Sequence, residues 1–303
     1  MVKLYGTVVP IVTPLTEEDT IDVESLERLV DHVIDGGLQC LYPCGTTGEM
    51  MYLTVEERKQ VAEVTVRHAA GRVPVFVHVG AWNQKDTIEL AQHAEKIGAD
   101  GIGVVTPAFY KLSDRGLVDF YKAVANSVSK DFPVYMYGIP QNAVNDINVS
   151  VCEAVAAECP NVVGIKYSYP DFTKLQQFMT VRDQSFSVLV GPDHLFQALC
   201  AAGGEGTVSG NAMIIPEHYA KLWDAICKKD YDLAVKYQRR TNVLNAVMCE
   251  INNIAAYKVI LKEEGVIKTA KVRRPMENLT PEQEKALLAE MKRLDYKKVL
   301  IKE

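Results

Sequence analysis

The sequence has no long uninterrupted hydrophobic run and no excess of positive charge. Its first apolar stretch, VVPIVTP, is broken by Pro10 and Pro14, which makes it too short for a membrane span or a signal segment. Lys and Arg total 33 against 39 Asp and Glu, the formal net charge is -6, and the basic residues are scattered. We therefore predict a cytoplasmic protein that partners neither a membrane nor nucleic acid.

The sequence also lacks the common short motifs of nucleotide sites and disulfide frameworks. Neither a GxGxxG fingerprint nor a P-loop occurs, which argues against a nucleotide-binding enzyme. The seven cysteines are an odd number without a CxxC pair, so they indicate reduced core thiols. Cys40 and Cys44, in CLYPC, could share one strand face, but two buried thiols are a simpler interpretation than a metal pair.

What the sequence does contain is a repeated alternation of Val/Ile-rich runs and amphipathic helical stretches up to about residue 228. This pattern predicts parallel strands joined by crossover helices. The predicted strands are residues 7–11, 39–44, 73–79, 101–106, 132–137, 162–166, 187–191 and 206–209. Eight such units predict a (β/α)8 barrel over residues 1–228, and residues 229–303 predict a C-terminal helical extension packed on it as part of one compact unit.

Barrels of this kind place their working residues at the C-terminal ends of the strands. That rule selects six segments, which we expect to face one pocket. They are CGTTGE after strand two, TPAFYK after strand four, YGIP after strand five, Lys166 at the end of strand six, GPD after strand seven and SGN after strand eight.

Lys166 ends the apolar run VVGI, so its amine should be buried. Burial disfavours the charged ammonium and favours the neutral amine, which is a nucleophile toward carbonyl groups. The alternatives are a fixed cation for an anionic substrate and a surface lysine whose stem alone is buried. Tyr137 ends the preceding strand and should neighbour Lys166, where its phenol could shuttle protons or its ring could simply plug the barrel.

The GTTGE segment predicts a turn that binds a carboxylate. Gly45 and Gly48 allow a tight backbone that exposes amide N–H groups, and Thr46 and Thr47 add hydroxyl donors. Gly/Thr turns are common in loops, so this segment alone is a weak signal.

Taken together, GTTGE, YGIP and GIK in this order closely resemble the dihydrodipicolinate synthase and N-acetylneuraminate lyase family. The similarity covers essentially the whole chain, including the opening GTVVPIVTPL and the C-terminal extension. It implies a pyruvate-dependent class I aldolase or lyase, usually a homotetramer, without a metal or other cofactor. In that family Lys166 would form an imine with pyruvate, Tyr137 would relay protons, and Thr46 and Thr47 would bind the carboxylate and join the relay. The resemblance also assigns two positions to the lining of the pyruvate site, Gly191 and Val208.

The chain departs from the family pattern at two places. Many members have a tyrosine after strand four that reaches the neighbouring subunit's site, and here Phe109 takes that register with Tyr110 one step later. Synthases of the lysine pathway have an arginine two residues after the proline of their YNVP motif, whereas Pro140 is followed here by Gln141 and Asn142. A neutral amide cannot replace a bidentate guanidinium on a carboxylate.

We therefore predict a lyase that cleaves a 2-oxo acid, such as a sugar acid, into pyruvate and an aldehyde. The lysine-pathway synthase remains the alternative. Four strand-end residues are polar candidates for the aldehyde end, although each could instead be a cap or turn residue: Ser168, Asp193, Ser209 and Asn211.

Two further classes compete with this prediction. A metal-dependent class II aldolase needs several converging ligands, and His78 with His194 is the only plausible pair, with no spaced motif behind it. A non-catalytic ligand sensor could use the same barrel, because fold does not fix function. A sensor, however, has no use for a reactive lysine beside a tyrosine.

Overall fold

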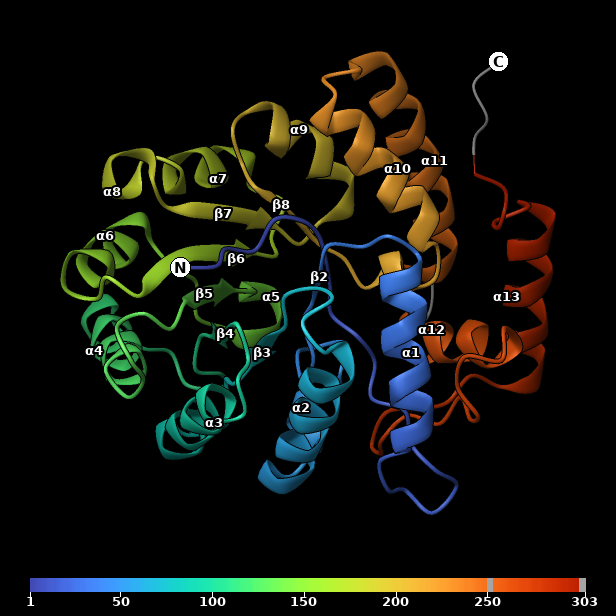
Figure 1. Ribbon diagram of the computed structural model, residues 1–303, viewed down its shortest axis with the longest axis horizontal. Coiled ribbons are helices and arrows are strands. Elements are labelled where there is room, and N and C mark those ends of the chain that lie inside the picture. The colour runs from blue at the N-terminus through green and yellow to red at the C-terminus, as the bar shows by residue number, and fades with distance from the viewer. Residues whose placement is uncertain (250–252, 300–303) are drawn as a thin grey trace.

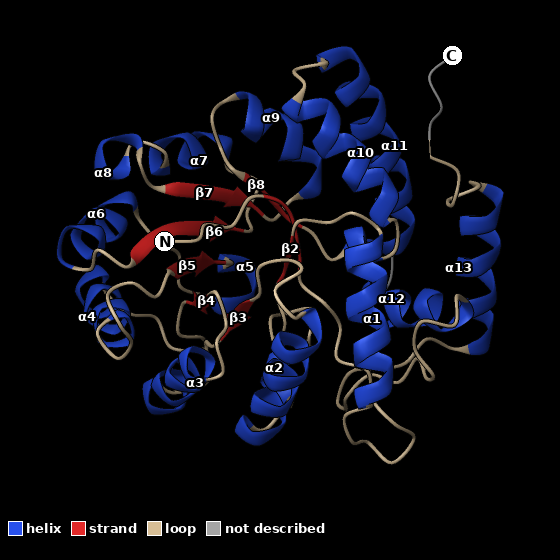
Figure 2. Cartoon of the chain, viewed as in Figure 1, coloured by secondary structure: helices blue, strands red, loops and turns tan. Residues whose placement is uncertain are grey.

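Eight short parallel strands form the centre of the protein in a computed structural model that describes residues 1–249 and 253–299. The sheet order is β2-β1-β8-β7-β6-β5-β4-β3, and a parallel bridge between Leu41 and Val75 joins its two ends, so the sheet closes into a barrel (Figure 2). The strands are β1 Gly6–Val9, β2 Cys40–Leu41, β3 Phe76–His78, β4 Gly101–Val105, β5 Val134–Gly138, β6 Val162–Tyr167, β7 Ser187–Val190 and β8 Gly206–Val208. The predicted fold class is confirmed.

Helices alternate with the strands and surround them (Figure 1). The longer ones around the barrel are α1 Val23–Asp35, α2 Val55–Ala69, α3 Gln84–Lys96, α4 Asp114–Ala125, α6 Val149–Glu158 and α10 Pro216–Cys227. The shorter ones are α5 Pro140–Ala143, α7 Phe172–Phe178, α8 Val181–Gln184 and α9 Phe196–Ala201, with 3-10 turns η1 Met50–Tyr52, η2 Asp193–Leu195 and η3 Asn211–Met213. Among residues 1–249 and 253–299, we find no helix with the length and apolar character needed to cross a membrane.

The ends of α2 show how local sequence sets an element. The Thr54 side chain accepts from the Glu57 backbone N–H, and the Glu57 carboxylate accepts from the Thr54 N–H, which forms a capping box. At the other end Ala70 and Gly71 both adopt positive φ, so the helix stops before β3.

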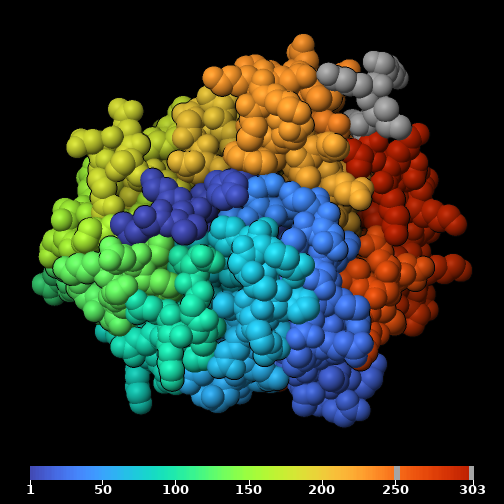
Figure 3. All heavy atoms as spheres, in the orientation of Figure 1, coloured from blue at the N-terminus to red at the C-terminus, as the bar shows by residue number. Residues whose placement is uncertain are grey.

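The barrel has one core inside the strands and a larger one between strands and helices. Inside, side chains from several strands pack under the N-terminal segment, whose Leu4 is fully buried and whose Leu4 N–H donates to the Tyr135 hydroxyl at 3.0 Å. Figure 3 shows the N-terminal residues lying across the middle of the face in view. The interior is therefore packed, and the open end is the one where the strands finish.

The C-terminal extension lies beside α1 at one side of the barrel (Figure 1). It consists of α11 Tyr231–Cys249, α12 Asn253–Glu263 and α13 Pro281–Arg293. Arg28 of α1 donates to the Val266 carbonyl at 3.0 Å, and the Thr269 hydroxyl donates to the Leu15 carbonyl at 2.7 Å. Residues 250–252 and 300–303 of the predicted extension lie outside the described residues.

Candidate active site

Lys166 and Tyr137 are neighbours because β5 and β6 pair in register at these two residues. The Lys166 side chain is almost completely buried, and its Nζ lies 3.9 Å from the centroid of the Tyr137 ring and 5.3 Å from that of Tyr42. Two aromatic faces therefore hold the amine in place at the end of its strand.

The Tyr137 hydroxyl belongs to a polar contact with the turn after β2. It lies 3.3 Å from the Thr46 hydroxyl, and the ring packs edge-on against His78 with the centroids 5.9 Å apart. Burial favours the neutral phenol, but the nearby charge of Lys166 and the hydrogen bond with Thr46 favour the phenolate. The latter two outweigh burial and hold the pKa of Tyr137 below its ordinary value.

The turn that carries Thr46 is tightly closed. The Glu49 N–H donates to the Thr46 carbonyl at 3.1 Å, and the Met50 N–H donates to the Gly45 carbonyl at 3.3 Å. A β-carbon at Gly48 would lie 3.2 Å from both the Cys44 nitrogen and the Ile11 carbonyl oxygen, so glycine suits this close approach.

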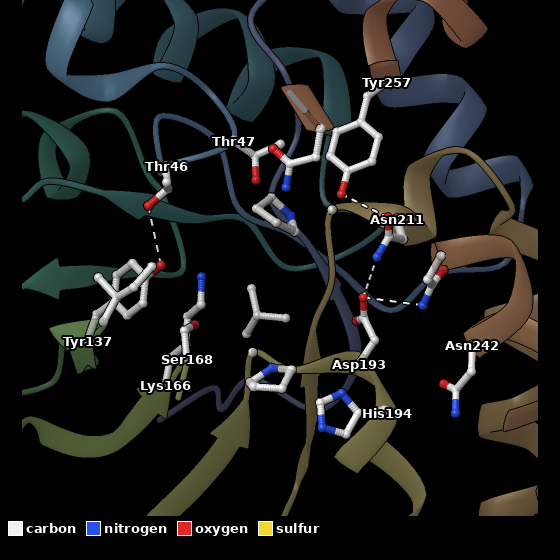
Figure 4. A pocket seen from close by; sticks show the side chains of 18 of the residues that line it. Thr46, Thr47, Tyr137, Lys166, Ser168, Asp193, His194, Asn211, Asn242 and Tyr257 are labelled. Atoms are coloured by element: carbon white, nitrogen blue, oxygen red, sulfur yellow. Dashed lines mark hydrogen bonds between the residues drawn. The ribbon is translucent and has the colours of Figure 1, made fainter. Parts of the chain in front are cut away.

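These groups open onto a cavity of about 520 Å³ at the mouth of the barrel (Figure 4). That volume suits a small organic acid. The lining residues are Pro10, Thr46, Thr47, Tyr137, Ile139, Lys166, Ser168, Gly191, Pro192, Asp193, His194, Val208, Gly210, Asn211, Asn242, Asn245, Ala246, Asn253 and Tyr257.

The wall opposite Lys166 is rich in hydrogen-bonding groups (Figure 4). Asp193 accepts from the Asn211 side-chain amide at 2.5 Å and from the Asn245 amide at 3.4 Å, while the Tyr257 hydroxyl donates to Asn211 at 2.8 Å. Burial raises the pKa of Asp193, and hydrogen bonds such as the one from Asn211 oppose that rise. The Oδ1 atom of Asn245 is buried and has no hydrogen-bond partner among the residues that the structure describes. We call Asp193, Asn211, Asn242, Asn245, Asn253 and Tyr257 the distal wall.

Most residues predicted for the site do line this one cavity. They are Lys166, Tyr137, Thr46, Thr47, Ser168, Gly191, Val208, Asn211 and Asp193. Gly191 is needed for steric reasons, because a β-carbon there would lie 2.0 Å from the Ser168 hydroxyl oxygen.

Other predicted residues lie elsewhere. Tyr110 is outside the cavity with 75% of its surface exposed, and its ring meets the equally exposed Phe109 edge-on at 5.0 Å. Gln141 and Asn142 are exposed on α5, where the Gln141 amide donates to the Ser168 carbonyl at 2.8 Å. Ser209 is a buried turn residue whose hydroxyl accepts from the Ala212 N–H at 3.2 Å.

The residues considered as metal ligands are also separated. His78 is fully buried and its Nδ1 lies 3.0 Å from the Cys44 carbonyl oxygen, whereas His194 lines the cavity. Burial raises the pKa of the Cys40 thiol to about 12 and that of Cys44 to about 11, which keeps both protonated. Within residues 1–249 and 253–299, no group of three His, Cys, Asp or Glu side chains could hold a metal ion.

Sequence reasoning missed the contribution of the extension to the cavity. Asn242, Asn245 and Ala246 come from α11, and Asn253 and Tyr257 come from α12. One signal was available, because Asn242 and Asn245 are three residues apart and so share a helix face.

An amine against a phenol of lowered pKa can attack a carbonyl carbon while the phenol moves the protons. Residues 3–294 match the model of the Dihydrodipicolinate synthetase family. This match and the arrangement of the site define the chain as a pyruvate-dependent class I aldolase, a carbon–carbon lyase. The chain belongs to the Dihydrodipicolinate synthetase family. The family resemblance predicted from the motifs is confirmed.

Three relatives illustrate the range of this similarity. The 4-hydroxy-tetrahydrodipicolinate synthase of Aquifex aeolicus is 32% identical over 95% of this chain and 97% of its own length. YagE, a prophage protein of the dihydrodipicolinic acid synthase family from E. coli K12 solved in complex with pyruvate, is 28% identical with a TM-score of 0.91, covering 97% of this chain and 99% of its own. The Ruminococcus gnavus sialic acid aldolase is also 28% identical with a TM-score of 0.91, over 97% and 98% of the two chains.

Proposed function

We propose that Lys166 forms an imine with pyruvate and that the enzyme makes or breaks the carbon–carbon bond between pyruvate and a hydroxylated aldehyde. In the cleavage direction the neutral amine attacks the C2 carbonyl of a 4-hydroxy-2-oxo acid, and water leaves to give a protonated imine. The C3–C4 bond then breaks as the C4 hydroxyl loses its proton. The imine accepts the electron pair as an enamine, and the aldehyde departs.

Tyr137 is the group best arranged to handle these protons. Its hydroxyl contacts the Thr46 hydroxyl and its ring lies against the Lys166 amine, and its lowered pKa favours the phenolate, which can accept the C4 hydroxyl proton. Protonation of the enamine at C3 and hydrolysis of the imine return pyruvate and the free amine. Thr46 and Thr47 would hold the pyruvate carboxylate through hydroxyl and backbone N–H donors.

The distal wall determines which substrate the cavity accepts. Asp193 places a hydrogen-bond acceptor opposite Lys166, and the amides around it can both donate and accept. Substrate hydroxyl groups can donate to Asp193, whereas a distal carboxylate would be repelled by it. Among the described residues that line the cavity, Lys166 is the only lysine or arginine, and it is committed to the imine. A polyhydroxylated chain, as in a sugar acid, therefore fits best.

The alternative is 4-hydroxy-tetrahydrodipicolinate synthase, the name borne by several relatives at 30–37% identity. That reaction uses aspartate semialdehyde, whose carboxylate needs a cationic partner far from the imine. Asn142, which takes the place of the synthase arginine, is exposed on α5 outside the cavity. This position argues against the alternative.

One experiment tests both halves of the proposal. Borohydride reduction with pyruvate should add one pyruvate-derived mass per chain at Lys166, and Lys166→Ala should abolish it, while Lys228→Ala, an exposed lysine paired with Asp224, should be labelled normally. A panel of aldehydes with pyruvate should then give a kcat/KM at least tenfold higher for hydroxyaldehydes than for aspartate semialdehyde, the equivalent of about 1.4 kcal/mol.

Three outcomes contradict parts of this proposal. An unmodified wild-type protein would indicate a ligand sensor, and labelling at another lysine would refute the role of Lys166. A preference for aspartate semialdehyde would make the lysine-pathway synthase the correct assignment. Activity that is lost in EDTA and restored by a metal ion would favour a class II mechanism instead.

We also propose that the protein is a homotetramer. The exposed Phe109 and Tyr110 rings, with a φ of +74° at Phe109, support a contact between subunits in which Tyr110 approaches a neighbouring site. Sedimentation velocity measures the assembly, and a monomer at micromolar concentration would contradict it.

We further propose that the protein works in a reducing, cytoplasmic compartment. Six cysteines are free thiols in the described part of the chain, in keeping with such a compartment.

A further inference from the structure

Glu49 ends the GTTGE segment, and unlike Thr46 and Thr47 it does not line the cavity. Its side chain is only about 1% exposed, and its backbone adopts a φ of +63°, a left-handed conformation that is unusual for a residue with a side chain. Its N–H closes the turn on the Thr46 carbonyl. Glu49 thus sets the backbone of the turn that presents Thr46 and Thr47.

The Glu49 carboxylate is held entirely by the C-terminal extension. One oxygen lies 2.5 Å from Nζ of Lys258 on α12, and the other accepts from the Arg273 backbone N–H at 2.6 Å. Lys258 is fully buried and also donates to the Lys271 carbonyl at 2.7 Å. A turn that follows β2 is therefore anchored to residues near the other end of the chain.

A buried ion pair is a poor source of stability, because removing two charges from water offsets much of their attraction. Its value lies instead in fixing one geometry. Tyr257, directly before Lys258, contributes to the distal wall and donates to Asn211 at 2.8 Å. A single turn of α12 therefore touches both the distal wall and, through Glu49, the turn after β2.

We infer that Glu49 and Lys258 form a positioning pair that holds the Thr46–Thr47 turn at the correct distance from Lys166, and so determines how well pyruvate binds. This inference rests on the proposed role of that turn in binding the pyruvate carboxylate. Neither residue lines the cavity, so both act through the turn.

The test compares Glu49→Gln, Lys258→Met and the double variant. Each single variant leaves one buried charge without its partner, so it should lower the unfolding midpoint and weaken pyruvate binding. The double variant removes both charges and should recover most of the midpoint. Its borohydride trapping should still be half-maximal only at a pyruvate concentration about ten- to a hundredfold higher than in the wild type. The reason is that the turn is no longer fixed.

The partly buried pair of Lys59 and Glu89, 2.6 Å apart, provides a control. It joins α2 to α3 and involves neither Glu49 nor a residue that lines the cavity, so Glu89→Gln with Lys59→Met should leave half-maximal trapping unchanged. Recovery of both the midpoint and pyruvate binding in the Glu49/Lys258 double variant would show that the pair is only structural. Absence of trapping in the wild type would instead refute the proposed function, so the two failures can be told apart.

Discussion

Tyr137 and Lys166 each alter the chemistry of the other. The amine lies against the face of the phenol ring, and its positive charge helps to lower the pKa of the phenol. A phenol with a lowered pKa is a better proton carrier at neutral pH, because it passes more readily between its two protonation states. The pair therefore supplies a nucleophile and a proton relay at directly paired positions of β6 and β5.

Tyr137→Phe should remove the relay and keep the packing. The ring still fills the space beside His78 and beneath Lys166, but the hydroxyl is lost, and turnover should fall on the order of 10² to 10⁴. Steady-state kcat, with circular dichroism to check folding, measures this effect.

Tyr135 provides the control for that substitution. It is another buried tyrosine, whose hydroxyl donates to the Ser187 hydroxyl at 3.0 Å and accepts from the Leu4 N–H away from the cavity. Tyr135→Phe should lose some stability and little turnover. Equal losses of turnover in both variants would remove Tyr137 from the proposed mechanism.

Among the elements, the strands were predictable and their exact ends were not. Strands buried on both faces read as continuous Val/Ile runs, which is why all eight appear in the sequence. The second predicted strand, 39–44, shrinks to Cys40–Leu41 because Tyr42 and Cys44 are also buried although they belong to the following loop. A hydrophobic run in the sequence indicates which residues are buried. After β2 the buried residues continue beyond the last hydrogen bond of the strand, so the run is longer than the strand.

The same reasoning explains which parts of the site could be predicted. Residues at strand ends, such as Lys166 and Asn211, are placed by the barrel itself, so their position follows from the strand assignment. Asn245 and Tyr257 reach the cavity only because α11 and α12 pack against its rim, and no local pattern encodes that long-range contact. Sequence reasoning therefore described the pyruvate side of the site better than the distal wall.

Gly103 of β4 tests how closely the strands pack inside the barrel. A β-carbon there would lie 1.7 Å from the Tyr42 hydroxyl oxygen of the loop after β2. Gly103→Ala should therefore destabilise the protein by about 1–3 kcal/mol or more in chemical denaturation, because the Tyr42 ring must move.

Two further variants make this prediction specific. Adding Tyr42→Val to Gly103→Ala removes the clashing ring and should restore part of the loss relative to the sum of the two single changes. Gly116→Ala in α4, where the nearest atom is 3.7 Å away, should be neutral or stabilising. An unchanged denaturation midpoint for Gly103→Ala would contradict the packing described here.

The molecule as a whole should lose stability in mild acid because it buries neutral histidines. Burial, helped by the charge of Arg240, lowers the pKa of His218 from 6.5 to about 4, and burial lowers the pKa of His78 still more strongly. The unfolded chain therefore binds more protons than the folded one between pH 4 and 6.5. The contribution of these neutral histidines to the free energy of unfolding is fully present above that range. It declines as the pH falls through the range, by up to ~3 kcal/mol for His218.

His218→Gln should flatten this dependence. The glutamine amide can still donate to the Lys298 carbonyl, which His218 contacts at 3.2 Å, but it does not titrate. Unfolding free energies from urea titrations at pH 7 and pH 5 should differ less in this variant than in the wild type. An equally steep decline in His218→Gln would refute the assignment.

The link between Glu49 and Lys258 also has a consequence for the order in which the enzyme matures. The turn after β2 leaves the ribosome roughly 200 residues before Lys258 does, which corresponds to about 10–40 s of synthesis. Lys166 is made within that interval, roughly 90 residues before Lys258, while the turn still lacks its anchor and the cavity lacks the part of its distal wall that α11 and α12 supply. A nascent chain would thus carry its nucleophile without a finished pyruvate site, and competence would arrive only as the last helices dock.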